Sequence, residues 1–240
     1  MTWYREWFGE EYLELYSHRD EEEARRQVAF FHEQCGAVSG SVLDLACGMG
    51  RHVTELRAGG YRAVGCDLSF TLLRTGLMEY GEFGAMPVAR ADMRQLPFCT
   101  ASFAALVNFF TSFGYFATEE ENLLVVEEMA RVLEPGAAFL FDYLNVHREL
   151  EKLVQRERRS TPLGQVQIER WFDSSDRSFN KRITIGQKRY LERVRGYELS
   201  EISKMFAACK LSIRSAFGDF DGNPFTVTSP RLILVGTKTP

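Results

Sequence analysis

The sequence predicts an α/β fold in which helices cover both faces of a parallel sheet. The first observation behind this prediction is that apolar, strand-like runs alternate with helical patterns from residue 41 to residue 144. The second is that these runs are continuously apolar, which is typical of strands buried on both faces of a sheet. The third is a change after residue 145, where polar and apolar residues alternate and indicate inserted antiparallel strands.

The N-terminal part of the chain predicts two helices ahead of the sheet. Aromatic and leucine side chains between residues 3 and 16 fall at helical spacing, so one amphipathic helix, acting as a lid, is expected there. Asp20 and Glu23 form a capping-box pattern that opens a second helix, and Gly36 is its stop signal.

The alternating region predicts five strands and three helices. The helices end at turns rich in glycine or proline, which are strong stop signals. The strands are expected at residues 41–45, 61–66, 86–91, 103–110 and 137–144. The helices are expected at residues 50–59, 69–80 and 119–133. Successive strands joined by helices run parallel, so their carboxyl ends meet at one edge of the sheet.

Beyond residue 145 the sequence predicts an antiparallel ribbon. Its two strands, 165–172 and 179–194, are joined by a turn-forming cluster, and residues 160–164 are at most a hinge. A helix at 197–209 and two closing strands then complete the sheet, at 211–217 and 231–238. We therefore expect three units. These are the N-terminal helices with a cofactor-binding core (1–145), an insertion facing substrate or partner (146–196), and a C-terminal completion of the core (197–240).

Composition and charge exclude several classes of protein. The chain of 240 residues contains no apolar run long enough for a membrane span, and its acidic N-terminus is not a secretory signal. Five widely spaced cysteines without a C-x-x-C pair predict reduced thiols, no metal site and a cytoplasmic location. The net charge of −4 argues against a general polyanion binder. However, residues 152–195 hold twelve Lys or Arg against five Asp or Glu.

The stretch VLDLACGMGRH at residues 42–52 points to the ligand. Asp44 ends the first strand and is followed by small residues, where backbone can lie against a ligand at the sheet's edge. A dinucleotide would place its pyrophosphate here, and Asp44 would repel it. Val53 also stands where a G-x-G-x-x-G fingerprint needs its third glycine. S-adenosylmethionine carries a cationic amine and a sulfonium but no phosphate. Asp44 would therefore attract this ligand instead of repelling it.

The next two strands also end near an aspartate. Asp67 closes the second strand, where a carboxylate can accept hydrogen bonds from both ribose hydroxyls. Asp92 follows the third strand and is placed to accept the adenine amino group, with the Met93 N–H facing a ring nitrogen. A single aspartate at such a position is more often a loop residue or helix cap, but three in succession predict a binding edge.

These motifs resemble a known family. VLDLACGMGRH, VGCDLS, ARADMRQLPF, ALVNFFTSFGYF and RVLEPGAAFLFDY, in this order, look like the successive motifs of class I S-adenosylmethionine-dependent methyltransferases of the bacterial small-molecule type, methyltransferase-11/25-like. The resemblance covers roughly residues 41–143 and, more loosely, 197–238. It implies a Rossmann-like sheet of seven strands with one antiparallel strand near the edge. Two positions depart from the family pattern. Ala46 stands where many members have glycine, and Cys209-Lys210 stands where they have Gly-Phe.

The resemblance also implies the site residues. The methionine-end loop is Asp44, Ala46, Gly48 and Gly50, while Asp67 with Leu68 faces the ribose and Asp92 with Met93 the adenine. Asn108 and Phe109 are expected to line the floor of the site. Independently of the resemblance, Tyr12, Tyr16 and Tyr115 are candidates for the pocket because a hydroxyl at its edge is useful. The product of the reaction would be S-adenosyl-L-homocysteine.

The residues that act on the methyl acceptor are less well specified. Alignment and a dry site are the main needs of methyl transfer, and aromatic faces favour a cationic methyl-sulfonium. Aromatic residues after the fourth strand and in the first helix are therefore candidates for the pocket, although Phe110 and Phe116 are expected in the core. The catalytic residue is unknown. His18, His147, Tyr115 and Asp219 are weak candidates, and His52 is expected on the surface or at a helix cap.

Three functions are compatible with the sequence. The first is methyl transfer to a small-molecule acceptor, which the basic insertion predicts to be anionic. The second is an RNA methyltransferase, disfavoured by the acidic remainder of the chain and by the sequence NFFT in place of N-P-P-Y. The third is a regulatory module that binds S-adenosylmethionine without catalysis. A homodimer through the insertion is an alternative use of its basic and aromatic residues.

Overall fold

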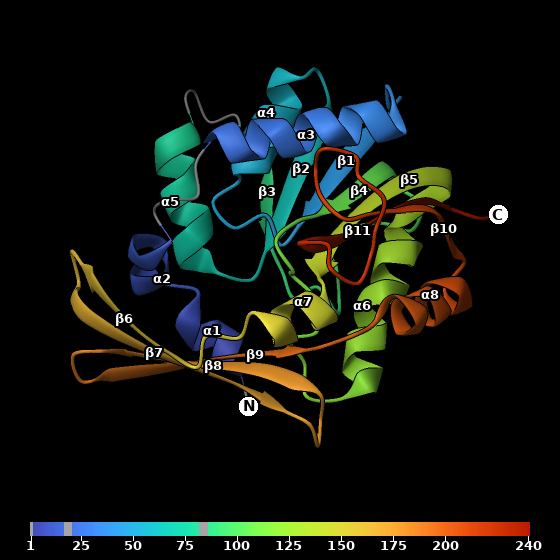
Figure 1. Ribbon diagram of the computed structural model, residues 1–240. Coiled ribbons are helices and arrows are strands. Elements are labelled where there is room, and N and C mark those ends of the chain that lie inside the picture. The colour runs from blue at the N-terminus through green and yellow to red at the C-terminus, as the bar shows by residue number, and fades with distance from the viewer. Residues whose placement is uncertain (1, 17–20, 82–85) are drawn as a thin grey trace.

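The chain folds into two β-sheets with helices around the larger one (Figure 1). The structure is a computed structural model that describes residues 2–16, 21–81 and 86–240. The larger sheet has seven strands in the order β10-β11-β5-β4-β1-β2-β3. Its bounds are β1 Ser41–Leu45, β2 Arg62–Asp67, β3 Val88–Arg90, β4 Phe103–Asn108, β5 Leu133–Leu144, β10 Leu211–Phe217 and β11 Arg231–Lys238. The predicted seven-stranded, mostly parallel sheet is confirmed.

One strand of this sheet runs against the others. β11 lies between β5 and β10 and pairs antiparallel with both. The remaining pairs, β3 with β2, β2 with β1, β1 with β4 and β4 with β5, are parallel. The carboxyl ends of the five parallel strands consequently meet at one edge, which is where the sequence places its aspartates.

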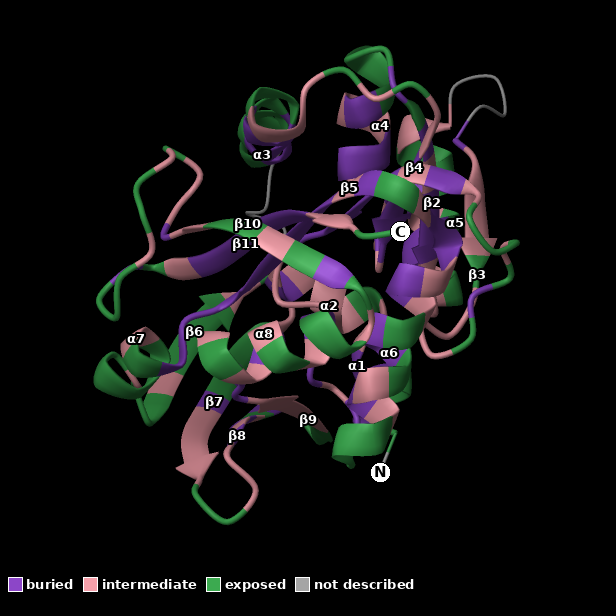
Figure 2. Cartoon of the chain, turned by 90° about the vertical axis from the view of Figure 1, so that its right-hand side faces the viewer, coloured by how far each residue is buried: buried purple, intermediate pink, exposed green. Residues whose placement is uncertain are grey.

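Helices cover both faces of the larger sheet. The helices of the described chain are α1 Trp3–Trp7, α2 Glu10–Leu15, α3 Glu21–Cys35, α4 Arg51–Ala58, α5 Phe70–Tyr80, α6 Glu119–Val132, α7 Val146–Glu151 and α8 Leu199–Ala208. Residues of α3, α4 and α5 pack on one face of the strands, and residues of α6 and α8 pack on the other. Figure 2 shows the strands buried between helices whose outer sides are exposed. Continuously apolar strands are required here because neither face meets water.

The insertion is a sheet of four strands rather than a ribbon of two. Its strands are β6 Arg156–Thr161, β7 Gly164–Asp173, β8 Ser178–Ile185 and β9 Lys188–Arg195, paired antiparallel in this order. The predicted long strand at 179–194 is broken at Gly186, whose φ of 58° turns the chain back. The predicted hinge at 160–164 is also wrong, because it contains the end of β6 and a tight turn into Gly164 at φ 94°.

The predicted single N-terminal helix is likewise two short ones. Gly9 has extended dihedral angles, φ −133° and ψ −156°, and separates α1 from α2. The two helices lie between the carboxyl edge of the larger sheet and the four-stranded sheet (Figure 1). The predicted capping residue Asp20 is outside the described residues.

The start of β5 and the end of β4 also differ from the prediction. β5 begins at Leu133 instead of residue 137, so the preceding helix ends at Val132. β4 ends at Asn108, and the next residues, Phe110 and Thr111, take positive φ angles of 60° and 61°. These angles turn the chain away from the sheet at the edge that carries the binding motifs.

Candidate functional site

The carboxylate at the end of β1 is buried and incompletely paired. Asp44 is 1% exposed, and its Oδ2 atom has no hydrogen-bond partner within the described residues. Burial raises the pKa of Asp44 well above its ordinary value of 3.8, and the nearby Asp67 carboxylate raises it further, while Arg51 opposes the rise. An unpaired carboxyl in this position costs stability unless a cationic ligand completes it.

The turn that follows Asp44 is built from left-handed residues. Ala46, Gly48 and Gly50 have φ angles of 60°, 58° and 82°. Gly48 and Gly50 adopt this conformation freely, whereas Ala46 stores strain on the order of 1 kcal/mol. The turn packs so closely against α5 that a Cβ added at Gly76 would lie 1.9 Å from the carbonyl oxygen of Met49. The shape of the loop therefore depends on a glycine in a neighbouring helix.

Gly76→Ala should destabilise the protein although alanine is the better helix former. In an open helix this change would add about 1 kcal/mol of stability. Here the backbone of the loop must move, at a cost of roughly 1–3 kcal/mol, and cofactor affinity should fall with it. Thermal unfolding and calorimetric titration with S-adenosylhomocysteine test this, with Arg74→Ala on the exposed side of α5 as the control. Wild-type stability and affinity in Gly76→Ala would contradict the packing described here.

Asp67 ties the loop to the second strand. Its Oδ2 accepts a hydrogen bond from the backbone N–H of Gly48 at 2.9 Å, and its Oδ1 accepts one from Ser69 at 2.7 Å. Burial raises the pKa of Asp67 above its ordinary value, and the backbone hydrogen bonds only partly offset this effect. The carboxylate thus holds the turn after Asp44 and the start of α5 in one arrangement.

Asp92 has a partner that sequence reasoning did not identify. Arg94 donates to its carboxylate through the backbone N–H and through the guanidinium, at 2.7–3.0 Å. Burial acts to raise the pKa of Asp92, but these hydrogen bonds and the charge of Arg94 outweigh it and lower the pKa. The sequence did contain a clue to this pair, because Arg94 follows Asp92 by only two residues. Asp92, Leu68 and Met93 all line the cavity described below.

The residues at the end of β4 differ in their roles. Asn108 is buried and donates from Nδ2 to the carbonyl of Leu45 at 2.8 Å, which joins β4 to β1. It is not among the residues that line the cavity, whereas Phe109 is. The Phe109 ring stacks at 4.2 Å on His52, whose Nε2 lies 2.6 Å from Oε1 of Gln27. His52 is therefore a buried packing residue and not the predicted surface or cap residue.

A cavity of about 800 Å³ joins these groups. It runs from the ends of β1 and β2 to the N-terminal helices and to the inner face of the four-stranded sheet. Its aromatic lining, within the described chain, is Trp3, Tyr4, Phe8, Tyr12, Tyr16, Tyr80, Phe109, Phe110, Tyr115, Phe116 and Phe179. The predicted residues Tyr16 and Tyr115 lie here, while Phe110 is half-buried on the wall instead of inside the core. The volume is large enough for a cofactor and a small acceptor together.

Three predicted candidates for the catalytic base are not placed in this cavity. His147 is exposed on α7, and its backbone N–H donates to the side chain of Asn145. Asp219 closes a surface turn by accepting hydrogen bonds from Asp221 and Asn223. His18 lies outside the described residues. Tyr115 is the one weak candidate that the structure brings to the wall.

The inner face of the insertion supplies wall residues that sequence reasoning missed. Arg170, Lys181 and Glu192 occupy matching positions on β7, β8 and β9, and all three line the cavity. The alternation of polar and apolar residues within each strand could be read from the sequence, but the register that places these three residues in one row depends on the turns between the strands. Among the described residues, no group of His, Cys, Asp or Glu is arranged to hold a metal ion, and no helix could cross a membrane.

Comparison with known proteins agrees with this geometry. Residues 42–136 match a family model described as a methyltransferase domain. This match, together with the fold, supports a class I S-adenosylmethionine-dependent methyltransferase. The matched region contains the Asp44 loop, Asp67 and Asp92, so the three aspartates that we predicted to bind the cofactor all lie within it.

Two solved structures and one curated relative show how far the similarity extends. A putative methyltransferase YqeM from Bacillus subtilis is 28% identical over 135 residues, which is 56% of this chain and 53% of the relative. The match therefore spans about half the length of that relative. An S-adenosylmethionine-dependent methyltransferase from Clostridium acetobutylicum superposes with a TM-score of 0.79 over 95% of this chain and 96% of the other, at 18% identity.

The second structure is CalS10 from Micromonospora echinaspora, an amino pentose methyltransferase with bound S-adenosylmethionine. It is 18% identical to this chain, with a TM-score of 0.69 over 96% of this chain and 97% of the other. The residues of this chain fit the same cofactor, because the buried Oδ2 atom of Asp44 has no hydrogen-bond partner among the described residues and the carboxylate would meet the ammonium group. The cofactor of the methyltransferase is S-adenosyl-L-methionine.

Proposed function

We propose that this protein transfers the methyl group of S-adenosylmethionine to a nitrogen atom of a small-molecule acceptor. The observation that carries the proposal is the buried, half-paired Asp44 carboxylate on the wall of a cavity that continues into an aromatic and acidic space. A carboxylate there binds an ammonium group and repels phosphate.

The proposed roles of the cofactor site follow from its geometry. Ionised Asp44 would hold the ammonium group of the methionine end, and the Gly48 turn would lie against its backbone. Asp67 would accept from the ribose with the lone pairs that Gly48 and Ser69 leave, and Asp92 would accept from the adenine amino group. When bound, the cofactor supplies a methyl group that is already activated for displacement. The chain then needs to align the acceptor and exclude water, which its aromatic wall can do.

The charge of the cavity favours an amine as acceptor. Its described lining holds eight carboxylates and four Lys or Arg side chains. The carboxylates are Glu10, Glu14, Asp44, Asp67, Glu79, Asp92, Glu149 and Glu192. Ion pairs join Arg170 to Glu157, Lys181 to Glu192 and Arg231 to Asp142. Aromatic faces next to carboxylates favour a cationic amine over an anion.

The anionic acceptor that we expected from the basic insertion loses its support for the same reason. Nine of the twelve Lys and Arg residues between 152 and 195 lie within 4 Å of a carboxylate. Four of the partners lie outside that segment, at Glu11, Glu119, Glu198 and Glu201. The local surplus is thus largely offset by the rest of the chain, and an RNA acceptor is disfavoured as well.

Nitrogen chemistry also explains why no single base stands out. An amine that binds as the ammonium would first give one proton to water or to a cavity carboxylate. Its lone pair would then take the methyl group, so that the N–C bond forms as the C–S bond breaks and the product amine is again cationic. The structural neighbour CalS10 is an amino pentose methyltransferase, which is consistent with an amine acceptor in a chain of this fold.

A matched panel of acceptors tests the proposal. Primary and secondary amines, including amino sugars, are incubated with S-adenosylmethionine beside their alcohol and carboxylate analogues, and S-adenosylhomocysteine is quantified. We expect turnover of at least one amine and roughly tenfold or greater preference over its alcohol analogue. Turnover confined to alcohols or carboxylates would overturn the nitrogen assignment. Tight cofactor binding without turnover would favour a regulatory module, and steeply salt-dependent tRNA binding would favour the RNA alternative.

The oligomeric state and the cytoplasmic location stay predictions. Arg156, Arg158 and Arg159 lie on β6, whose second edge is unpaired in the four-stranded sheet. Charged edge strands resist pairing with a second copy, so a dimer through this edge is disfavoured. Sedimentation of the purified protein distinguishes a monomer from a dimer.

A further inference from the structure

One carboxylate connects the N-terminal helices to the insertion. Glu192 lies on β9 with its side chain on the cavity wall. Its Oε1 accepts a hydrogen bond from the indole N–H of Trp7 at 2.5 Å and one from the hydroxyl of Tyr16 at 3.2 Å. Lys181 completes the group with an ion pair at 3.2 Å. Trp7 and Tyr16 are 185 and 176 residues away along the chain.

These contacts are internal rather than exposed surface pairs. The side chain of Glu192 is 20% exposed, that of Lys181 15%, and Trp7 is buried. Hydrogen bonds to a charged acceptor in such surroundings are stronger than neutral ones. The Lys181 ammonium also lies 4.8 Å from the centroid of the Tyr16 ring and donates to its hydroxyl. The group therefore fixes the orientation of Tyr16 at the cavity wall.

The N-terminal segment, residues 2–16, depends on such tertiary contacts. Its helices have five and six residues, too few to be stable in isolation. Its other polar links to the rest of the protein include a hydrogen bond from Ser69 to the Phe8 carbonyl and one from Trp3 to the Tyr115 carbonyl. They also include the ion pair of Glu11 with Lys188, and Arg94 lies 3.4 Å from the Tyr4 hydroxyl. The Lys188 side chain is 66% exposed, so this ion pair contributes little.

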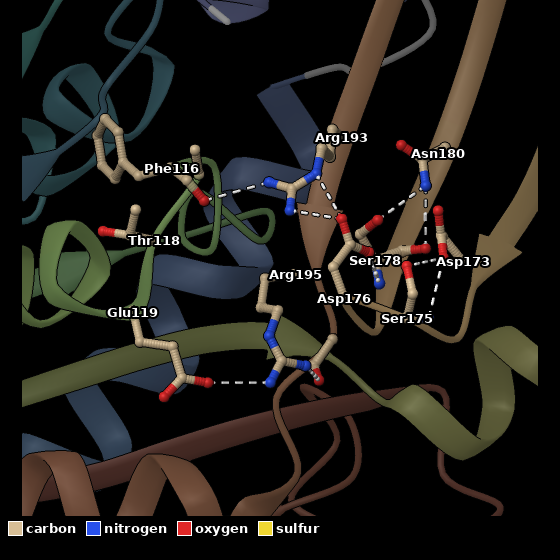
Figure 3. A network of polar contacts seen from close by, with 12 residues as sticks. Phe116, Thr118, Glu119, Asp173, Ser175, Asp176, Ser178, Asn180, Arg193 and Arg195 are labelled. Carbon is tan, nitrogen blue, oxygen red and sulfur yellow. Dashed lines mark hydrogen bonds and ion pairs between the residues drawn. The ribbon is translucent and has the colours of Figure 1, made fainter.

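The insertion, by contrast, is attached to the core without Glu192. Figure 3 shows Arg193 donating to the carbonyl of Phe116 and to Asp176, and Arg195 paired with Glu119 at the start of α6. The backbone N–H of Arg195 also donates to the carbonyl of Gly114 at 2.7 Å. Loss of the Glu192 carboxylate should consequently release the N-terminal segment while β9 stays in place.

We propose that Glu192 is a positioning residue that holds the N-terminal segment closed over the cavity and thereby sets the affinity for the cofactor. The segment contributes Phe8, Tyr12 and Tyr16 to the wall, and Ser69, which bonds Phe8, is adjacent to the proposed ribose position. Glu192 does not touch the reacting atoms in this proposal. The effect on binding rests on the proposed function, whereas closure of the segment is a property of the chain alone.

The test separates these two parts. Limited trypsin digestion without ligand measures cleavage at Arg5, an exposed site within α1. Calorimetric titration with S-adenosylhomocysteine measures affinity. Glu192→Gln should accelerate cleavage at Arg5 and weaken binding by roughly tenfold, since a charge-assisted interaction is lost. Trp7→Phe keeps an aromatic side chain but removes the indole donor and part of the buried ring, so it should change both readouts in the same direction. The control is Glu169→Gln, which removes pairs with Arg156 and Arg182 on the outer face of the insertion.

The outcomes decide the proposal even if one variant folds poorly. Non-additive effects in the Trp7→Phe and Glu192→Gln double variant would support direct coupling through this hydrogen bond. Wild-type cleavage at Arg5 in both single variants would overturn the closure. Faster cleavage with unchanged affinity would overturn the effect on the cofactor. A wild-type protein that binds no S-adenosylhomocysteine refutes the proposed function, and with it the effect on affinity, while the cleavage assay still decides whether Glu192 holds the segment.

Discussion

Asp44→Asn should weaken S-adenosylmethionine binding by 10–100-fold without lowering the stability of the ligand-free protein. The loss corresponds to a charge-assisted hydrogen bond, about 1.5–3 kcal/mol. Stability should hold because the wild-type carboxyl is 1% exposed and has an oxygen without a hydrogen-bond partner in the described structure. Removing a buried charge that lacks compensation relieves a cost instead of creating one.

The pH dependence gives an independent test of the same residue. Because the pKa of Asp44 is raised above 3.8 in the folded state, the folded protein keeps a proton that the unfolded chain releases. The free energy of unfolding of the ligand-free protein should therefore fall as pH rises above about 3.8, until the raised pKa is passed. Cofactor affinity should rise over the same window, because the ionised carboxylate binds the ammonium group. In Asp44→Asn, both the free energy of unfolding and the cofactor affinity should depend less on pH. Part of the pH dependence should stay, because burial also raises the pKa of Asp67.

Calorimetry across a pH series and chemical denaturation provide these measurements. Asp219→Asn is the matched control, because Asp219 is an aspartate in a surface turn away from the cavity. It should bind the cofactor as the wild type does. Wild-type affinity in Asp44→Asn at every pH would be incompatible with an ammonium partner for Asp44.

The sequence correctly predicted those parts of the fold that depend on residues close to one another along the chain. Asp44, Asp67 and Asp92 each follow an apolar run directly, and parallel pairing of those runs brings their ends together whatever the details of packing. The left-handed turn after Asp44 was likewise legible from its small residues. In these places local pattern and global fold agree.

The parts that escaped prediction depend on contacts between distant segments. The helical spacing of residues 3–16 was real, but whether Gly9 interrupts it is decided by packing against β9 and α5. The row of Arg170, Lys181 and Glu192 requires a register that two turns set together. His52 was misplaced because helix periodicity does not reveal that Phe109, which follows β4, stacks on it.

Asp67→Ala is expected to reduce both binding and stability, in contrast to Asp44→Asn. The Asp67 carboxylate accepts hydrogen bonds from the backbone of Gly48 and of Ser69. Alanine leaves both donors without their partner, at a cost of about 1–3 kcal/mol each when buried. A total near 2 kcal/mol corresponds to a decrease in melting temperature of roughly 4–8 °C for a chain of this size. Affinity should fall by at least as much as in Asp44→Asn, since the proposed ribose contact and the shape of the loop are lost together.

The control for this variant is an aspartate with the same local bonding far from the cavity. Asp173 accepts a hydrogen bond from the backbone N–H of Ser175 at 2.9 Å, two residues on, as Asp67 does from Ser69. Asp173→Ala should leave affinity unchanged and lower the melting temperature only slightly, because its turn is exposed. If Asp67→Ala matched Asp173→Ala in both measurements, Asp67 would be a turn residue alone. A large loss of stability with wild-type affinity would instead leave Asp67 as a loop anchor with no contact to the cofactor.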